Sequence, residues 1–289
     1  MSEVKGVTLG HIWKAGTRYL ENAGIERAER DVQLILARHV SLDPGVMRLK
    51  LDMTLDPTTY SMGFQRSFWA DMDARKAGMP VSKIIGSRAF WTSEFYVNTD
   101  VLDPRPDTET LIETALSLGP QKRVLDLGTG SGAIAISLAK EWPRADVIAT
   151  DISERALKVA RRNVAALGVA GGVVLLESDW FDRVDGRFDL IVSNPPYIAL
   201  DEMDGLSTEV AKFDPRIALT DEGDGLCCLR RIAAGAPLHL NAGGWLMVEI
   251  GPTQGAAVVA LFDAAGFANS AVGQDLDGRD RVVLGQKPL

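Results

Sequence analysis

Apolar residues recur at helical spacing in three runs within the first 80 positions. The first run follows Thr8, a possible N-cap, and stops before Gly24. The second closes before a turn-forming Ser-Leu-Asp-Pro-Gly segment. The third opens at Asp56 and Pro57, a capping residue followed by a first-turn proline, and ends near Gly78, Met79 and Pro80. This pattern predicts a small all-helical domain over residues 1–80, which we interpret as a module for substrate recognition.

The pattern changes between Ser82 and Leu102 to two short β-prone pieces, KIIGSRAFW and EFYVNT. Thr92 and Ser93 separate them and supply a turn. We therefore predict a β-hairpin that acts as a linker over residues 81–103.

Strands and helices then alternate over residues 104–289. Asp107 or Thr108 is positioned to cap the first of these helices. The alternating segments are RVLDLG, AIAISLAKEW, DVIATD, RALKVARRNVAALG, GVVLLES and FDLIVSN, followed later by WLMVEI and a last strand near Arg281. Alternation of this kind predicts an α/β domain, a Rossmann-like and mostly parallel sheet with helices on both faces.

Composition adds limits on location and partners. The 289 residues are 46% hydrophobic and 24% charged, as in an ordinary soluble protein. No window approaches the roughly 20 apolar residues of a membrane span, and the start lacks a signal-peptide core. We expect a cytoplasmic chain. With 31 Lys and Arg against 39 Asp and Glu, the net charge of −8 disfavours direct nucleic-acid binding.

Metal binding is not expected. The only cysteines, Cys227 and Cys228, are adjacent, and His11, His39 and His239 are scattered along the chain. Neither arrangement has the spacing of a metal site, so we interpret the cysteines as reduced structural thiols.

A glycine-rich turn follows the first strand of the α/β region. The expected cofactor loop comprises Gly128, Thr129, Gly130, Ser131 and Gly132. Its glycines allow a ligand to lie close to the backbone, although a purely structural turn is the alternative. The third glycine comes one residue too early for a dinucleotide fingerprint.

Two carboxylates accompany this loop. Asp126 would repel a pyrophosphate and suit a cationic amino group, and Asp151, at the end of the next strand, can accept both hydroxyls of a ribose. An adenosine that carries an amino acid fits both, which indicates S-adenosylmethionine. After the third strand, Trp180 is expected on the adenine and Asp179 at its exocyclic amine. Alternatively, Trp180 only fills the core.

The fourth strand ends in Asn194, Pro195, Pro196 and Tyr197. Prolines stiffen the turn and have no N–H of their own, so Asn194 Oδ1 and the Pro195 carbonyl can form a pair of acceptors for an NH₂ group. Tyr197 would pack against the planar group and exclude water. The expected catalytic residues are therefore Asn194, Pro195 and Tyr197, with an amide or a base amine as methyl acceptor. The alternative is a stiff turn without chemistry.

Several motifs together resemble the glutamine methyltransferases of peptide-chain release factors, often called HemK-type. They are PRPDTE, VLDLGTGSGAIAISLA, SDWF, SNPPYI, FDPRIAL and GRDRVV. The resemblance begins near residue 80 and implies a class I S-adenosylmethionine-dependent methyltransferase fold, with a helical domain that helps to bind the release factor. Asp103, which precedes PRP where an apolar residue is expected, departs from the family pattern.

The resemblance also implies a substrate and residue roles. The substrate would be the glutamine of the Gly-Gly-Gln motif, held by Asn194, Pro195, Pro196 and Tyr197, and Asn194 would also lie on the cofactor side. Asn-Pro-Pro-Tyr is shared with DNA adenine and rRNA guanine methyltransferases. Two alternatives thus stay open: methylation of an exocyclic base amine in DNA or rRNA, and a non-enzymatic protein that binds S-adenosylmethionine.

Overall fold

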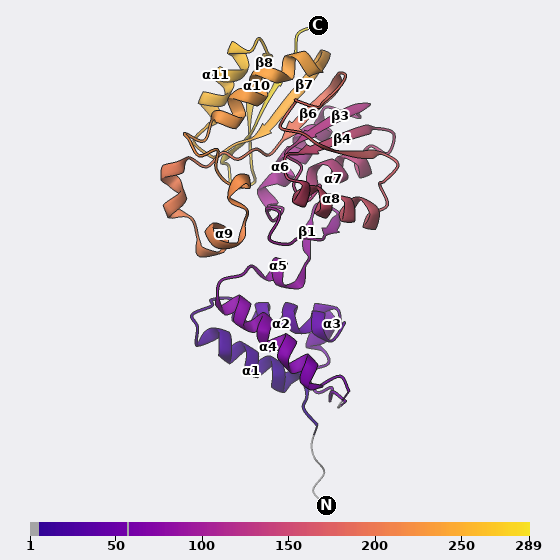
Figure 1. The fold of residues 1–289 in the computed structure, drawn as a ribbon, viewed down its shortest axis with the longest axis vertical. Coiled ribbons are helices and arrows are strands. Elements are labelled where there is room, and N and C mark those ends of the chain that lie inside the picture. Colours follow the sequence, from indigo (N-terminus) through magenta and orange to yellow (C-terminus); the bar gives the residue numbers. More distant parts are fainter. Residues whose placement is uncertain (1–5, 57) are drawn as a thin grey trace, which may run out of the picture. The chain divides into compact units, whose positions relative to one another are not determined.

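The computed structural model describes residues 6–56 and 58–289. These residues form two compact units, of which the first ends at Gly86 and the second begins at Ser87 (Figure 1). No helix in the described ranges combines the length and the apolar composition that a membrane crossing requires.

The first unit is helical around its own apolar core. Its helices are α1 (Leu9–Glu21), α2 (Ala28–His39), α3 (Pro44–Arg48), α4 (Met62–Lys76) and α5 (Val81–Ile85). Leu9, Ile35 and Phe68 are almost fully buried. Thr8 caps α1 as predicted, because its hydroxyl accepts a hydrogen bond from the His11 amide at 3.3 Å.

The predicted start of the third run was wrong. Asp56 Oδ1 accepts from the amides of Thr58 and Thr59 at 2.9 and 3.0 Å, which closes a separate turn. Helix α4 begins only after Ser61, whose hydroxyl caps it. Pro57, the expected first-turn proline, lies outside the described residues.

The hairpin is shorter than the sequence suggested. Strands β1 (Arg88–Phe90) and β2 (Ser93–Phe95) pair antiparallel, whereas Val81–Ile85 is the helix α5. Gly86 ends that helix with a φ of 70°, a left-handed conformation that glycine adopts without strain. The β-prone residues before Gly86 are therefore helical.

The second unit contains one seven-stranded sheet in the order β5-β4-β3-β6-β7-β9-β8. The strands are β3 (Arg123–Leu127), β4 (Asp146–Asp151), β5 (Val173–Glu177), β6 (Phe188–Ser193), β7 (Leu240–Glu249), β8 (Ala268–Gln274) and β9 (Asp280–Gln286). The first five in the order are parallel, and β9 pairs antiparallel with both neighbours. Strand β8 was missed because most of its side chains are exposed at the edge and show no apolar alternation.

Helices cover both faces of this sheet (Figure 1). They are α6 (Glu109–Ser117), α7 (Ala133–Glu141) and α8 (Glu154–Ala166) against one core, and α10 (Cys227–His239) and α11 (Gly255–Ala264) against the other. Short segments join these elements: η1 (Pro106–Thr108), η2 (Leu200–Gly205), α9 (Thr208–Phe213) and η3 (Arg216–Ala218). The predicted class I α/β fold with a helical N-terminal region is confirmed.

Candidate functional site

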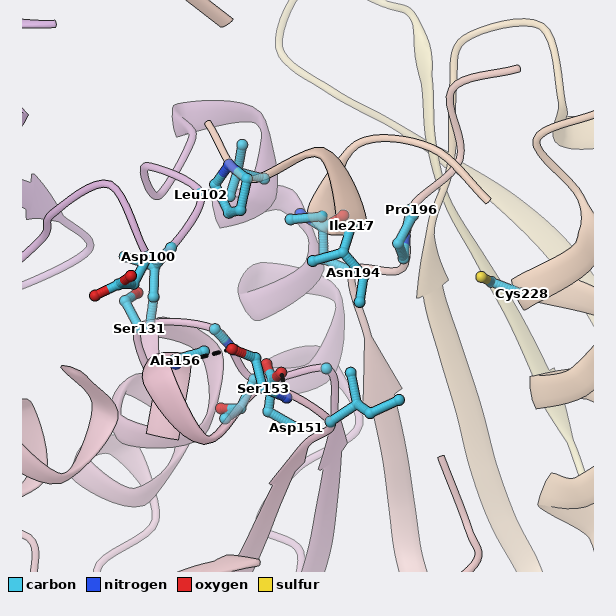
Figure 2. A pocket seen from close by; sticks show the side chains of 18 of the residues that line it. Asp100, Leu102, Ser131, Asp151, Ser153, Ala156, Asn194, Pro196, Ile217 and Cys228 are labelled. Atoms are coloured by element: carbon cyan, nitrogen blue, oxygen red, sulfur yellow. Dashed lines mark hydrogen bonds between the residues drawn. The ribbon is translucent and has the colours of Figure 1, made fainter. Parts of the chain in front are cut away.

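A cavity of about 540 Å³ lies at the carboxyl ends of the parallel strands. Its wall includes most of the glycine loop, Asp151, Trp180 and Asn194, which come from four different strand ends. Two further segments, 100–105 and 215–222, add residues to the wall, among them Asp100, Leu102 and Ile217 (Figure 2). Ligands of open α/β sheets collect at this edge, so the fold itself places the cavity where a cofactor would be held.

The glycine loop is held open by backbone contacts to the next strand. The Gly130 amide donates to Asp151 Oδ2 at 2.8 Å, and the Thr129 amide donates to the Thr150 carbonyl at 2.8 Å. Gly130 and Gly132 have φ values of 57° and 83°, and a Cβ on Gly132 would lie only 3.0 Å from Ile136 Cδ1. Side chains at these positions would strain the loop.

Asp126 lies beneath the loop and not on the cavity wall. Its Oδ2 accepts from Thr129 Oγ1 at 2.6 Å and from the Ala135 amide at 3.2 Å. Gly132 cannot cap α7 with a side chain, so Asp126 satisfies an amide of its first turn instead. Burial raises the pKa of Asp126 to about 7. A direct contact between Asp126 and a cofactor amino group stays a prediction.

Asp151 is positioned to receive a polyol. Its Oδ1 accepts from the Ser153 amide and its Oδ2 from the Gly130 amide, both at 2.8 Å, and it lines the cavity. Each carboxylate oxygen has a second lone pair, so both can still accept a hydroxyl. Ile152, 52% exposed, adds an apolar surface beside it that the sequence analysis missed. Together these residues fit an adenosine.

Asp179 and Trp180 also line the cavity. Both oxygens of Asp179 accept from Arg231 of α10, at 3.2 and 3.1 Å. Trp180 contacts the core between the sheet and α10 while it faces the cavity, so the two interpretations of this residue are compatible. The proposed contact of Asp179 with an adenine amine stays a prediction.

Asn194 lies on the cavity wall with its amide oriented by a neighbour. Its Nδ2 donates to Thr108 Oγ1 at 3.2 Å, which turns Oδ1 to the opposite side of the planar group. The predicted capping of α6 by Asp107 or Thr108 was wrong, because no side chain caps this helix. The 3₁₀ turn η1 precedes α6 directly, and the Thr108 hydroxyl is bonded to Asn194 instead.

The rest of the Asn-Pro-Pro-Tyr segment divides between the wall and the interior. Pro196 lines the cavity, whereas Pro195 is buried and Tyr197 lies behind the wall. The Tyr197 hydroxyl donates to Glu249 Oε1 at 3.2 Å, and its carbonyl accepts from Gln254 Nε2 at 2.9 Å. The segment is thus held at both its side chain and its backbone.

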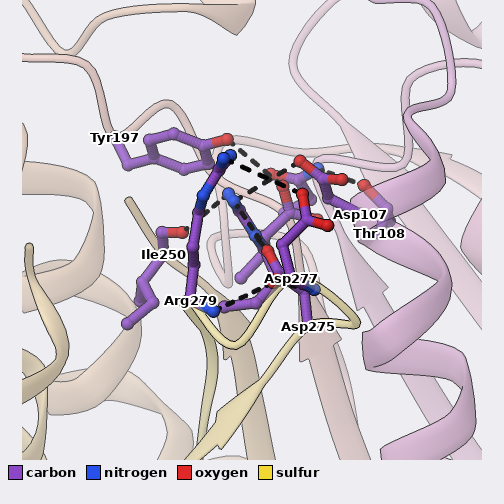
Figure 3. Close-up of polar contacts among 10 residues, drawn as sticks. Asp107, Thr108, Tyr197, Ile250, Asp275, Asp277 and Arg279 are labelled. Atoms are coloured by element: carbon purple, nitrogen blue, oxygen red, sulfur yellow. Dashed lines mark hydrogen bonds and ion pairs between the residues drawn. The ribbon is translucent and has the colours of Figure 1, made fainter. Parts of the chain in front are cut away.

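Glu249 and Arg281 were not identified from the sequence as site residues. Glu249 is 1% exposed, and burial raises its pKa to about 7. Arg281 is 5% exposed and pairs with Asp275 at 3.1 Å and with Asp107 at 3.4 Å. Figure 3 labels Asp107, Asp275 and Tyr197 of this cluster. The sequence did contain a signal for Glu249, because this carboxylate lies at the end of the otherwise apolar strand WLMVEI.

Other predicted features are placed as follows. Asp103 is buried and lines the cavity. Cys228 is half-buried and also lines the cavity, while Cys227 is exposed. Within the part of the chain that the structure describes, no group of three or more His, Cys, Asp or Glu side chains could hold a metal ion.

Known proteins resemble this chain over both units. The family model described as "Methyltransferase small domain" matches residues 100–214, and the one described as "PrmC N-terminal domain" matches residues 11–86. A release factor glutamine methyltransferase of Cereibacter sphaeroides is 50% identical and aligns over 95% of this chain and 97% of that protein. Another, of Xylella fastidiosa, is 45% identical over 92% and 96%.

One solved structure is similar to this chain in its fold, and its low sequence identity limits the comparison to the fold. It is a 16S rRNA methyltransferase of Thermus thermophilus in complex with AdoMet and guanosine. The match has a TM-score of 0.51 and 19% identity, and covers 70% of this chain and 49% of that one.

Proposed function

Because the chain belongs to the release factor glutamine methyltransferase family, we propose that it methylates the side-chain amide nitrogen of a glutamine in release factors. The acceptor is the glutamine of the Gly-Gly-Gln motif, and the methyl donor is S-adenosylmethionine. The observation that carries this proposal is Asn194, which lines the cavity and whose Nδ2 is bonded to Thr108 Oγ1, so that its Oδ1 is left to accept a hydrogen bond.

The cofactor is held by the glycine loop and the strand ends. Asp151 accepts the ribose hydroxyls, Ile152 and Trp180 provide apolar surfaces for the adenine, and Gly128 to Gly132 let the ligand lie close to the backbone. When bound, the cofactor would supply a methyl group on a sulfonium, from which a neutral thioether is a good leaving group.

The substrate amide is held by two acceptors. Asn194 Oδ1 and the Pro195 carbonyl each accept one hydrogen of the glutamine NH₂ group. This fixes the nitrogen, whose lone pair is otherwise tied up by conjugation, and favours its pyramidalisation as the new bond forms. Pro196 and Tyr197 stiffen the segment and exclude water. The nitrogen loses a proton after transfer, so no general base is required.

The first unit matches the PrmC N-terminal domain and is proposed to contact the release factor. Release factors act on ribosomes, so this substrate implies a cytoplasmic site of action.

The test is incubation with methyl-labelled S-adenosylmethionine and purified release factor, followed by peptide mapping. We expect label on the Gly-Gly-Gln glutamine and none when that glutamine is replaced by asparagine. Duplex DNA and rRNA are tested in parallel. Label on either nucleic acid with blank release factor would overturn the proposal in favour of a base amine, and cofactor binding without any turnover would indicate a non-enzymatic binder.

A further inference from the structure

Glu249 is a carboxyl group buried at the carboxyl end of β7, between β6 and β9. Its Oε1 accepts from the Tyr197 hydroxyl at 3.2 Å. Its Oε2 is buried and forms no hydrogen bond that meets ordinary geometry with any residue described here. Burial of such a group costs folding free energy unless its interactions compensate for the lost water.

Charged and polar groups from three segments interact with this carboxyl. Tyr197 comes from the segment after β6, Thr108 and Asp107 come from η1, and Arg281 comes from β9. Burial and the Asp107 charge raise the pKa of Glu249, while Thr108, Arg281 and Tyr197 lower it. Arg281 is in turn paired with Asp275 and Asp107, so its positive charge is shared among three carboxyls.

Thr108 connects Glu249 to the other end of the Asn-Pro-Pro-Tyr segment. Its hydroxyl oxygen accepts from Asn194 Nδ2 at 3.2 Å. A hydroxyl has one hydrogen to donate, and the Glu249 carboxyl is close enough to Thr108 for this side chain to lower its pKa. When ionised, this carboxyl accepts from Tyr197 and attracts the Thr108 hydrogen, which leaves the Thr108 oxygen free to accept from Asn194.

We propose that Glu249 is a positioning residue for methyl transfer, which holds Tyr197 directly and Asn194 through Thr108, so that Asn194 Oδ1 faces the substrate. The inference rests on the proposed function, because it assigns Asn194 Oδ1 to the substrate NH₂ group. It extends that function to a group outside the cavity wall.

The first test is Glu249→Gln, which keeps the shape of the side chain and an acceptor for Tyr197. Its NH₂ group faces the Thr108 hydroxyl with a donor, which disfavours the working orientation of Thr108 and Asn194. We expect the single-turnover rate at saturating cofactor to fall about 10-fold to 100-fold, as for small misplacements of a reacting group. The cofactor Kd should change by less than about twofold, a difference of about 0.4 kcal/mol.

A matched pair at Thr108 tests the connection. Thr108→Val keeps the shape and removes the hydroxyl, whereas Thr108→Ser keeps the hydroxyl. The valine variant should lose about as much rate as Glu249→Gln, and the serine variant should recover most of that loss. Combining Thr108→Val with Glu249→Gln should cost little more than either change alone, because both interrupt one chain of contacts.

Two readouts separate positioning from a merely structural role. The wild-type single-turnover rate should rise between about pH 6 and pH 8 as Glu249 ionises, and Glu249→Gln should lose this rise. Asp146→Asn, which removes an exposed carboxyl at the start of β4, should keep it. Without substrate, the side-chain NH₂ signal of Asn194 in ¹⁵N-asparagine-labelled protein should shift in Glu249→Gln and Thr108→Val and stay in place in Thr108→Ser.

The inference is overturned if Glu249→Gln retains the wild-type rate, if its loss lies wholly in cofactor Kd, or if the Asn194 signal does not move. Failure of the proposed function is a different result, namely a wild-type protein that leaves release factor unlabelled. The Asn194 signal decides the positioning role in that case too.

Discussion

At the scale of single residues, Asn194 combines two hydrogen-bonding roles in one planar group. Nδ2 is bonded to Thr108 Oγ1, and the proposal assigns Oδ1 to the substrate. Substitutions that remove one of these roles or both can therefore distinguish the bond that orients the side chain from the proposed acceptance of a substrate hydrogen by Oδ1.

Asn194→Ala removes both roles and should lower the single-turnover rate about 10²–10³-fold, as for other preorganised polar groups aimed at a transition state. Asn194→Asp keeps an acceptor and places a negative charge near a nitrogen that becomes positive, but it loses the donor to Thr108. It should therefore retain more activity than alanine and less than wild type. The measurement is single-turnover methylation of a release factor at saturating cofactor. An alanine variant as fast as wild type would show that the segment is only a stiff turn.

Asp151 should affect the cofactor much more than the substrate. Asp151→Ala removes the expected acceptor for the ribose hydroxyls, and charge-assisted hydrogen bonds contribute about 1.5–3 kcal/mol, so the cofactor Kd should rise about tenfold to a hundredfold. Titration calorimetry measures it. Asp146→Ala, at the exposed opposite end of the same strand, is the matched control and should bind normally. An unchanged Kd for Asp151→Ala would remove this residue from the site.

At the scale of elements, the segment after β6 is fastened by the loop before α11. Gln254 Nε2 donates to the Tyr197 carbonyl at 2.9 Å and to the Gly225 carbonyl at 3.2 Å, while Gln254 Oε1 accepts from the Gly251 amide at 2.9 Å. Three separate loops are thus joined by one amide. Gly225 permits this, because its φ is 75° and a Cβ there would lie 2.3 Å from the Tyr197 carbonyl oxygen.

Gly225→Ala should therefore displace the Asn-Pro-Pro-Tyr segment. We expect a loss of stability of about 1–3 kcal/mol from backbone strain and a lower single-turnover rate. Gly223→Ala is the matched control, since the nearest atom to its Cβ would be Asp221 Oδ1 at an ordinary 3.4 Å. Denaturant unfolding and single-turnover methylation measure the two effects. Equal behaviour of the two variants would show that the close approach at Gly225 does not matter.

At the scale of the whole molecule, three carboxyls whose pKa is raised by burial couple stability to pH: Asp126, Glu249 and Asp151. The pKa values of Asp126 and Glu249 are both raised to about 7, mainly by burial. Between the ordinary pKa of a carboxyl and this value the folded state binds more protons than the unfolded state, so stability falls as pH rises. Carboxyls with lowered pKa values, such as Asp224, contribute the opposite slope only at more acidic pH.

Asp126→Asn should flatten the pH dependence of the unfolding free energy between about pH 5 and pH 7. Wild-type unfolding free energy should decrease over this range by up to about 1.4 kcal/mol per pH unit for each buried carboxyl. The variant should lose the contribution of Asp126 and show a flatter profile. Urea unfolding at several pH values measures it, and Asp182→Asn, at an exposed position, should leave the wild-type slope unchanged. A variant with the full wild-type slope would contradict the assignment of Asp126.

The sequence alone determined the class of fold and the segments that form the cavity. Alternating strands and helices, a glycine turn before a helix, and Asn-Pro-Pro-Tyr after a strand are local patterns, and each reflects a periodicity or a backbone preference contained in a few neighbouring residues. Because parallel strands end at one edge of the sheet, those patterns also predicted that Gly130, Asp151 and Asn194 would meet, as they do in the cavity wall.

Only the tertiary structure decided which side chains support these residues. The bond from Asn194 to Thr108 joins positions 86 residues apart, and the bond from Tyr197 to Glu249 joins positions 52 residues apart. Thr108 had the features of a helix cap, and its hydroxyl is bonded elsewhere because the folded sheet brings Asn194 to it. Asp126, whose expected contact with the ligand stays a prediction, accepts a hydrogen bond from the Ala135 amide at the start of α7. Polar partners of this kind lie far apart in the sequence and become neighbours only when the chain folds. A local sequence pattern therefore cannot predict them.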